Sequence, residues 1–206
     1  MEFLPIIAAI LFVDFLALIS PGPNFVLTTS AAVSKSRRHA VWTACGIAMG
    51  SLAWAGAAAL GVASVFEALP PLGLLLKVLG IAYLIYLGIK LLRSKGFQPN
   101  AHQTTDATSG ARGFWRGLLV NMTNPKSAAY YASVFAAFLT PDMPVWVLVL
   151  LVVAIAVMSL VWHVLIAISF SASRVQARYI SVSKYVDQIC GGVLVFLGLR
   201  MAWDSR

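Results

Sequence analysis

The sequence predicts an all-α integral membrane protein with six membrane-spanning helices and no soluble domain. Hydrophobic residues make up 60% of the 206 residues and charged residues only 11%, whereas soluble domains average about 25% charged residues. The apolar residues form six runs, each close to the roughly 20 residues that a span requires. Lys and Arg gather in the polar segments between alternate runs. A chain of this length is expected to be a single transmembrane domain, residues 1–206.

The six runs follow one another with a single long polar segment after the third. The first run, 3–33, is interrupted near residues 21–23, and the fourth, 114–139, is interrupted at 124–125. The segment 93–113, rich in Thr, Ser and Gln, is the predicted linker. No positively charged leader precedes the first run, so it is expected to be a retained helix. The other four spans are predicted over residues 41–66, 72–92, 145–170 and 185–203.

The distribution of basic residues predicts which way the loops face. Eleven Lys and Arg residues lie in the loops after spans one, three and five, against three near the opposite ends of the spans. Because cytoplasmic loops carry an excess of Lys and Arg, we place the basic loops in the cytoplasm and both termini on the outer side. The same distribution accounts for the net charge of +8 without a nucleic-acid partner.

Weak internal repeats divide the chain into two halves of three spans. Ser-Leu-Ala-Trp at 51–54 recurs as Ser-Leu-Val-Trp at 159–162, and the end of span three, 86–90, recurs at 196–200, both about 110 residues later. Two three-span halves joined by one loop must be inverted relative to each other, as in many secondary transporters. We therefore predict two inverted repeats, over residues 1–92 and 114–206.

The proline breaks of spans one and four are the predicted functional centre. Inside hydrocarbon, irregular backbone is tolerated only where it is buried in protein or lines a cavity. Ser20 before Pro21 and Asn124 before Pro125 both fit an N-cap followed by proline at the first helical position. Each break would begin a half-helix whose free N–H groups and positive dipole end attract an anion such as a carboxylate. The alternative is a plain proline kink without a ligand.

The predicted substrate-binding residues come from these two breaks and from the half-helix after the second. A charge at mid-membrane costs roughly 2.5–3.5 kcal/mol, so Lys126 should have an anion beside it, either a substrate carboxylate or Asp14. Alternatively, its side chain snorkels to the cytoplasmic face. Asn121, Asn124 and Tyr131 share one face at helical spacing, which suits a cavity wall or interhelical hydrogen bonds. The set comprises Pro21, Gly22, Pro23, Asn24, Asn121, Asn124, Pro125, Lys126 and Tyr131.

Two further residues are candidates for proton coupling. Asp14 lies inside the first span, and an acid in a span is a functional candidate by default. It could carry a proton, pair with Lys126, or lie near the interface without a role. His163, in the fifth span, is either a proton relay or a hydrogen-bonded packing residue. Asp187 and Gln188 are expected to cap the start of the sixth span or to pair with the basic loop before it.

Other features narrow the classes of function. No Walker-type phosphate-binding sequence occurs, so the chain carries no ATP engine, and we expect neither an enzyme activity nor a cofactor. Cys45 and Cys190 form no CxxC pair, and no disulfide or metal site is predicted from them. Gly46 and Gly50 form a GxxxG, which predicts close helix packing, either within the chain or in a homodimer. The second span, 41–66, contains no acid, which favours a substrate with a neutral side chain.

Several short motifs along the whole chain carry a family resemblance. They are Ser-Pro-Gly-Pro-Asn at 20–24, Ser-Lys-Ser-Arg-Arg at 34–38, Gly-Ile-Ala-Met-Gly at 46–50, Ala-Tyr-Leu-Ile-Tyr-Leu-Gly at 82–88, and Phe-x-x-Gly-Leu-Leu-Val-Asn-x-x-Asn-Pro-Lys at 114–126. With these motifs the chain resembles the lysine exporter / homoserine–threonine resistance (LysE/RhtB) family, and within it the threonine and homoserine efflux branch. Many threonine-type members have Asp after Pro-Gly-Pro. Asn24 stands there in this chain, which implies proton coupling through another group such as Asp14.

The resemblance implies a secondary exporter of small neutral amino acids, such as threonine or homoserine, in the bacterial inner membrane. Its partners would be the amino acid, protons and membrane lipid, with both termini in the periplasm. Two alternatives from other classes stay open. One is a membrane thiol redox relay through Cys45 and Cys190. The other is an exporter of divalent metal ions, for which only Asp14 and His163 lie in spans as ligands.

Overall fold

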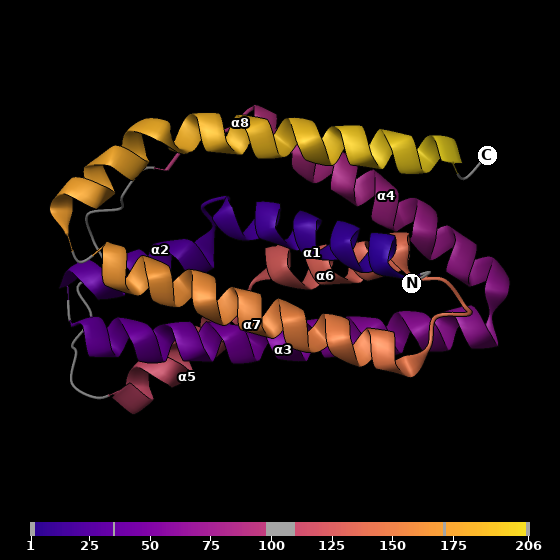
Figure 1. Cartoon of the computed structure of the whole chain (residues 1–206), viewed down its shortest axis with the longest axis horizontal. Coiled ribbons are helices and arrows are strands. Elements are labelled where there is room, and N and C mark those ends of the chain that lie inside the picture. Colours follow the sequence, from indigo (N-terminus) through magenta and orange to yellow (C-terminus); the bar gives the residue numbers. More distant parts are fainter. Residues whose placement is uncertain (1–2, 35, 98–109, 171, 205–206) are drawn as a thin grey trace.

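A computed structural model describes residues 3–34, 36–97, 110–170 and 172–204. Within these residues the chain forms eight helices and no strand (Figure 1), which confirms the all-α prediction. The helices are α1 (Leu4–Ile19), α2 (Pro23–Ser34), α3 (Arg37–Ala68), α4 (Pro70–Leu92), α5 (Gly110–Met122), α6 (Pro125–Phe138), α7 (Val145–Ser169) and α8 (Ser173–Asp204).

Four of these helices, α3, α4, α7 and α8, are long and apolar enough to cross a membrane. The pair α1 and α2 qualifies as a fifth span, bent by 52° at the break between them. The described residues therefore contain four to five candidate spans. Helices α5 and α6 occupy the predicted fourth span but have only 13 and 14 residues, and neither reaches alone the roughly 20 residues that a bilayer requires.

The long helices form two layers with the broken segments between or beside them. Helices α3 and α7 pack together in one layer and α4 and α8 in the other, while α1, α2 and α6 lie between the layers and α5 runs along α3 (Figure 1). The beginning of α1 and the end of α8 lie at the same end of the molecule, together with the turn from α3 to α4.

Two boundaries differ from the sequence-based prediction. Helix α5 begins at Gly110, inside the segment predicted as a linker, and residues 98–109 of that linker lie outside the described residues. Helix α8 begins at Ser173, well before the predicted start of the sixth span at residue 185. No Gly or Pro interrupts the chain between 173 and 190, so the helix continues beyond its apolar part. The prediction that Asp187 caps the start of this helix is therefore wrong.

The contact between α3 and α5 depends on glycines. A Cβ atom built on Gly46 would overlap the carbonyl oxygen of Phe114, and one built on Gly117 would overlap that of Thr43. Gly50 lies against the side chain of Asn121. The GxxxG of Gly46 and Gly50 thus serves close packing within the chain, the first of the two predicted uses.

Residues from equivalent positions of the sequence repeats contact one another. The hydroxyls of Ser51 and Ser159, which begin the repeated Ser-Leu-x-Trp, form a hydrogen bond of 3.1 Å between α3 and α7. Between α4 and α8, a Cβ on Gly88 would meet Val195, and a Cβ on Gly198 would meet Ile85. The repeat relates Ser51 to Ser159, and it exchanges the two glycine contacts with each other, because Gly88 corresponds to Gly198 and Ile85 to Val195.

Candidate functional site

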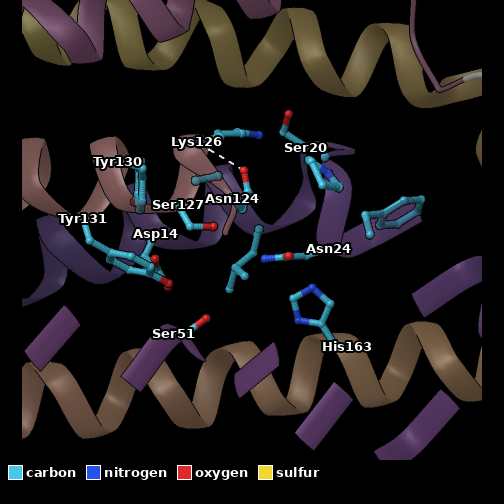
Figure 2. Close-up of a pocket in the computed structure, with 15 residues that line it drawn as sticks. Asp14, Ser20, Asn24, Ser51, Asn124, Lys126, Ser127, Tyr130, Tyr131 and His163 are labelled. Atoms are coloured by element: carbon cyan, nitrogen blue, oxygen red, sulfur yellow. Dashed lines mark hydrogen bonds between the residues drawn. The ribbon is translucent and has the colours of Figure 1, made fainter. Parts of the chain in front are cut away.

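The two breaks meet at a cavity of about 60 Å³ in the middle of the molecule (Figure 2). Its walls come from α1, α2, α3, α6, α7 and the segment that joins α1 to α2. Most of the predicted site residues line this cavity, and Pro21 and Pro125 line a larger neighbouring one. Those at the central cavity are Asp14, Gly22, Pro23, Asn24, Asn124, Lys126, Tyr131 and His163.

The first break is an open connection between α1 and α2. Helix α1 ends at Ile19 and α2 begins at Pro23, with the Val26 N–H donating to the Gly22 carbonyl at 2.9 Å. A residue that precedes proline avoids the α region, so the second proline moves the helix start beyond Gly22. The prediction that Ser20 caps this helix is therefore wrong. Ser20 follows the end of α1 instead, and its buried hydroxyl has no hydrogen-bond partner.

The second break is capped as predicted. The Asn124 side chain accepts a hydrogen bond of 3.0 Å from the Lys126 N–H, and Pro125 occupies the first turn of α6. This side-chain acceptor satisfies one of the N–H groups that a helix start leaves free. The second half-helix therefore has a capped beginning, whereas the residue before the first, Gly22, has no side chain that could cap it.

Asn121 lies outside the cavity, although the sequence places it on one face with Asn124 and Tyr131. The break separates it from them, because it belongs to α5 and they belong to the start of α6. Asn121 is fully buried, and its amide donates to the Ile47 carbonyl at 2.7 Å and to the Ser51 hydroxyl at 3.1 Å. These contacts fasten α5 to α3, in agreement with the interhelical alternative.

Lys126 lines two cavities at once. One is the central cavity, and the other, of about 770 Å³, extends past the breaks to Lys90 of α4, Arg93 just after α4, and Asp187 of α8. The Lys126 ammonium lies beside Gly22 of the first break. Among the described residues, no carboxylate lies within 4.0 Å of it, so Asp14 does not pair with Lys126.

Four polar atoms in the central cavity are buried without a hydrogen-bond partner. They are Asp14 Oδ2, Ser20 Oγ, Asn24 Oδ1 and Tyr130 Oη. Buried polar groups in proteins are nearly always paired, and each unpaired group costs about 1–3 kcal/mol. Four such atoms around one small space can offer hydrogen bonds to water or to a polar ligand.

His163 reaches into the cavity from α7 toward Asn24 (Figure 2). Its Nδ1 lies 2.8 Å from the Ser159 carbonyl oxygen. Since a carbonyl oxygen only accepts, Nδ1 carries the hydrogen, and Nε2 of the neutral ring is an acceptor. The Ser159 hydroxyl in turn contacts Ser51, which receives the Asn121 amide. A continuous chain of hydrogen bonds therefore joins α7, α3 and α5 beside the cavity.

An aromatic cluster packs behind the start of α2. Phe25 stacks on Tyr179 with ring centroids 4.8 Å apart and contacts Phe97 and Phe170 edge-on. The Tyr179 hydroxyl donates to the carbonyl of Ile19, the last residue of α1, at 3.0 Å. Helix α8 thereby contacts both sides of the first break.

Several residues that line the two cavities were not among the predicted site residues, and three of them are Tyr130, Ser51 and Asp187. Tyr130 follows Lys126 by one helical turn, and Ser51 begins the repeated Ser-Leu-x-Trp. The sequence shows both of these features, but neither feature indicates that the residue lines a binding site. Asp187 lines the larger cavity with Oδ1 buried and unpaired, while Oδ2 accepts from Ser94. The sequence places Asp187 near the start of a helix, whereas the structure begins α8 at Ser173 and so places Asp187 in its middle.

The described residues include neither a cluster of metal ligands nor a cysteine that lines either cavity. No group of three or more His, Cys, Asp or Glu side chains is placed to hold a metal ion there. Cys45 on α3 and Cys190 on α8 are both free thiols, and neither lines the two cavities.

The chain is similar to a family of translocators and to proteins named for threonine efflux. The family model described as LysE type translocator matches residues 15–205. The chain is 33% identical to the threonine efflux protein of Escherichia coli (strain K12) over 193 residues, 92% of this chain and 93% of that protein. It is 30% identical to the threonine efflux protein of Salmonella typhi, with 92% and 93% coverage. It is also 31% identical to an uncharacterized membrane protein of Haemophilus influenzae, with 95% coverage of each. No solved structure matches the chain.

Proposed function

The chain belongs to the LysE type translocator family, and we propose that it exports small neutral amino acids like threonine or homoserine across the bacterial inner membrane in exchange for protons. The cavity between the two breaks carries this proposal, because unpaired polar atoms and Lys126 surround a space at two half-helix starts. The names of the relatives in Escherichia coli and Salmonella typhi support threonine as the representative substrate.

The substrate carboxylate would bind at Lys126 and the starts of α2 and α6. The N-terminal end of a helix attracts anions through its free N–H groups and its dipole. Gly22, the residue before α2, has no side chain to cap these groups, and the Lys126 ammonium lies beside it. A carboxylate placed here would also give Lys126 a close ion pair, since no described carboxylate lies within 4.0 Å of its ammonium and Asp187 faces it only across the larger cavity.

A short, neutral side chain fits the remaining space. The central cavity is small, at about 60 Å³, which favours a short side chain over a long one. From α3, the wall residue is Ser51, and residues 41–66 of this helix contain no acid that could match a second positive charge on the substrate. We therefore propose that lysine and arginine are poor substrates.

The larger cavity would be the cytoplasmic entrance to the site. It measures about 770 Å³ and is lined by Lys90 and Arg93 as well as Lys126. Basic walls raise the local concentration of an anionic group, and the excess of Lys and Arg marks the cytoplasmic side. Lys126, which lines both cavities, would be the point where an entering carboxylate passes from one to the other.

Six spans in two inverted repeats, residues 1–92 and 114–206, are the proposed transport architecture. Helices α5 and α6 together would form the fourth span, as α1 and α2 form the first. Support comes from the hydrogen bond between Ser51 and Ser159 and from the reciprocal packing of Gly88 and Gly198. An even number of spans also agrees with α1 beginning and α8 ending at the same end of the molecule (Figure 1), which we propose is periplasmic.

Counterflow in proteoliposomes tests the proposed function. Purified protein reconstituted into vesicles loaded with threonine should accumulate labelled threonine from outside, and added lysine should compete poorly. Absence of exchange by the folded protein would contradict the proposal.

Lys126→Ala should abolish this counterflow without loss of folded protein, because the carboxylate loses its counter-charge. Lys95→Ala is the matched control, since Lys95 is exposed and lines neither cavity, and it should transport normally. Normal transport by Lys126→Ala would remove Lys126 from the site.

A further inference from the structure

Asp14 is a buried acid without a counter-charge. It projects from α1 with an exposed fraction of 1%, and its Oδ2 has no hydrogen-bond partner. None of the described Lys or Arg side chains lies within 4.0 Å of it. An isolated buried carboxylate is strongly disfavoured in its ionised form, so Asp14 needs either a proton or a bound cation.

Asp14 and Lys126 line the same small cavity but do not form an ion pair. One cavity thus contains an acceptor for a positive group and a donor for a negative group, separated from each other. An α-amino acid carries an ammonium and a carboxylate on the same carbon atom and can occupy both positions together. A carboxylic acid without the amine, or an amine without the carboxylate, would leave one of the two charges unmatched.

The surroundings of Asp14 suit an ammonium group. Figure 2 shows Asp14 beside the rings of Tyr130 and Tyr131, which project from α6, and aromatic rings attract cations. The Tyr130 hydroxyl is buried and faces the Asp14 carboxyl, and the Ser51 hydroxyl, which also contacts Ser159 and the Asn121 amide, lies across the cavity. An ammonium has three N–H donors, which matches a carboxylate and hydroxyls better than an uncharged group would.

We propose that the Asp14 carboxylate binds the α-ammonium group of the transported amino acid, and that this ammonium and a proton compete for it. The inference rests on the proposed function and adds a mechanism that couples the export of the amino acid to the entry of a proton. When substrate enters from the cytoplasm, the Asp14 carboxyl releases its proton to that side and pairs with the ammonium. On the other side a proton binds Asp14 and the amino acid leaves. One proton moves inward for each amino acid that moves outward.

Few other titratable groups face Asp14. Helix α6 contributes Lys126, Tyr130 and Tyr131, and α7 contributes His163. The residues of α2 and α3 at the cavity, among them Asn24 and Ser51, do not titrate. From α8, no described residue lines the cavity. His163 donates from Nδ1 to Ser159 within its own helix. Oδ2 of Asp14 has no such hydrogen-bond partner, so this carboxylate oxygen is available to a proton or a ligand.

Binding measurements on the purified full-length protein test this competition. Threonine affinity of the wild type should fall as the pH is lowered, by up to tenfold per pH unit, because protons occupy Asp14. Asp14→Asn should bind threonine at least tenfold more weakly and lose the pH dependence, while Asp14→Glu should retain it. Glu67→Gln changes an exposed acid and should behave as the wild type. Unchanged affinity and pH dependence in Asp14→Asn would overturn the inference.

A substrate analogue separates recognition of the ammonium from a structural effect. In 2,3-dihydroxybutanoate a hydroxyl replaces the threonine ammonium, so the wild type should bind it at least a hundredfold more weakly than threonine. In Asp14→Asn this ratio should fall toward one. A ratio that stays at the wild-type value would overturn the inference and leave the proposed function intact, whereas a folded wild type that binds no amino acid overturns both.

Proton release from the wild type gives a measurement that requires no variant. In weakly buffered solution with a pH indicator, saturation with threonine should release up to one proton per protein. Lys95→Ala should release the same number. Binding of threonine without proton release at any pH between 5 and 8 would overturn the inference.

Discussion

The two proline breaks occupy matching places in the two halves of the chain, yet they are held differently. At the second, Asn124 caps α6, Asn121 ties α5 to α3, and glycines bring the two helices into backbone contact. At the first, the residue before α2 is Gly22, which has no side chain to cap the helix, and the Ser20 hydroxyl has no partner, while Tyr179 of α8 donates to the Ile19 carbonyl. We infer from this difference that the second break is the more firmly held wall of the cavity and that the first break is the part that moves during transport.

This asymmetry fits a carrier that opens alternately to its two sides. A site must keep one surface constant to recognise the substrate while another surface rearranges to expose it. Lys126 and Tyr131 belong to the fixed half, whereas Asp14 and Asn24 belong to the two helices beside the mobile break. Movement of α1 and α2 would therefore carry Asp14 toward or away from Lys126.

The largest expected effects come from replacing glycine with alanine near each break. Near the second break the substitution should lower stability, and at the first break it should lower the transport rate. Gly117→Ala places a methyl group against the Thr43 backbone, and overpacking of this kind costs about 1–3 kcal/mol. At Gly22 a methyl group would meet only the Lys126 side chain, at 3.4 Å. Gly22→Ala should therefore fold normally but transport more slowly. Melting temperatures and counterflow rates of the two variants provide the measurement.

Gly192→Ala is the control for the glycine variants. No atom lies within 4 Å of a Cβ built there, so alanine should leave stability unchanged or raise it by up to about 1 kcal/mol through a better helix propensity. Equal losses of stability in Gly117→Ala and Gly22→Ala would contradict the distinction between a fixed and a mobile break.

Removal of the polar side chain before each half-helix should have a smaller effect. Asn124→Ala removes a cap, and the free energy of unfolding should fall by about 1 kcal/mol. Ser20→Ala removes a buried hydroxyl that has no partner, so stability without substrate should not fall. Denaturation of both variants in the same detergent measures this. A loss in Ser20→Ala as large as in Asn124→Ala would mean that Ser20 also supports its helix.

The sequence predicted the general architecture better than the details of each break. Apolar runs locate the helices because burial in lipid requires them, and an Asn before a single proline correctly predicts the Asn124 cap. Ser20 failed in the same role because a second proline, Pro23, moves the helix start. Periodicity placed Asn121 with Tyr131, but it assumes a continuous helix, and the break removes that relation.

Relations between distant helices were the least predictable part of the site. Rare charges within spans singled out Asp14 and Lys126, and both line the central cavity. That they share a cavity without pairing depends on how α1 crosses α6, which no local pattern encodes. The sequence likewise offers no reason to select Tyr130 for the cavity ahead of its neighbours, because its relevance comes from the direction of its hydroxyl.

Backbone hydrogen exchange with and without threonine tests the central claim most directly. The account predicts that threonine slows exchange over residues 20–26, where the α2 start has no side-chain cap, and changes residues 121–128 little because Asn124 already holds the Lys126 N–H. In Lys126→Ala, threonine should slow neither segment. Equal slowing at both breaks, or slowing only at the second, would contradict an account in which the substrate orders a mobile first break against a fixed second one.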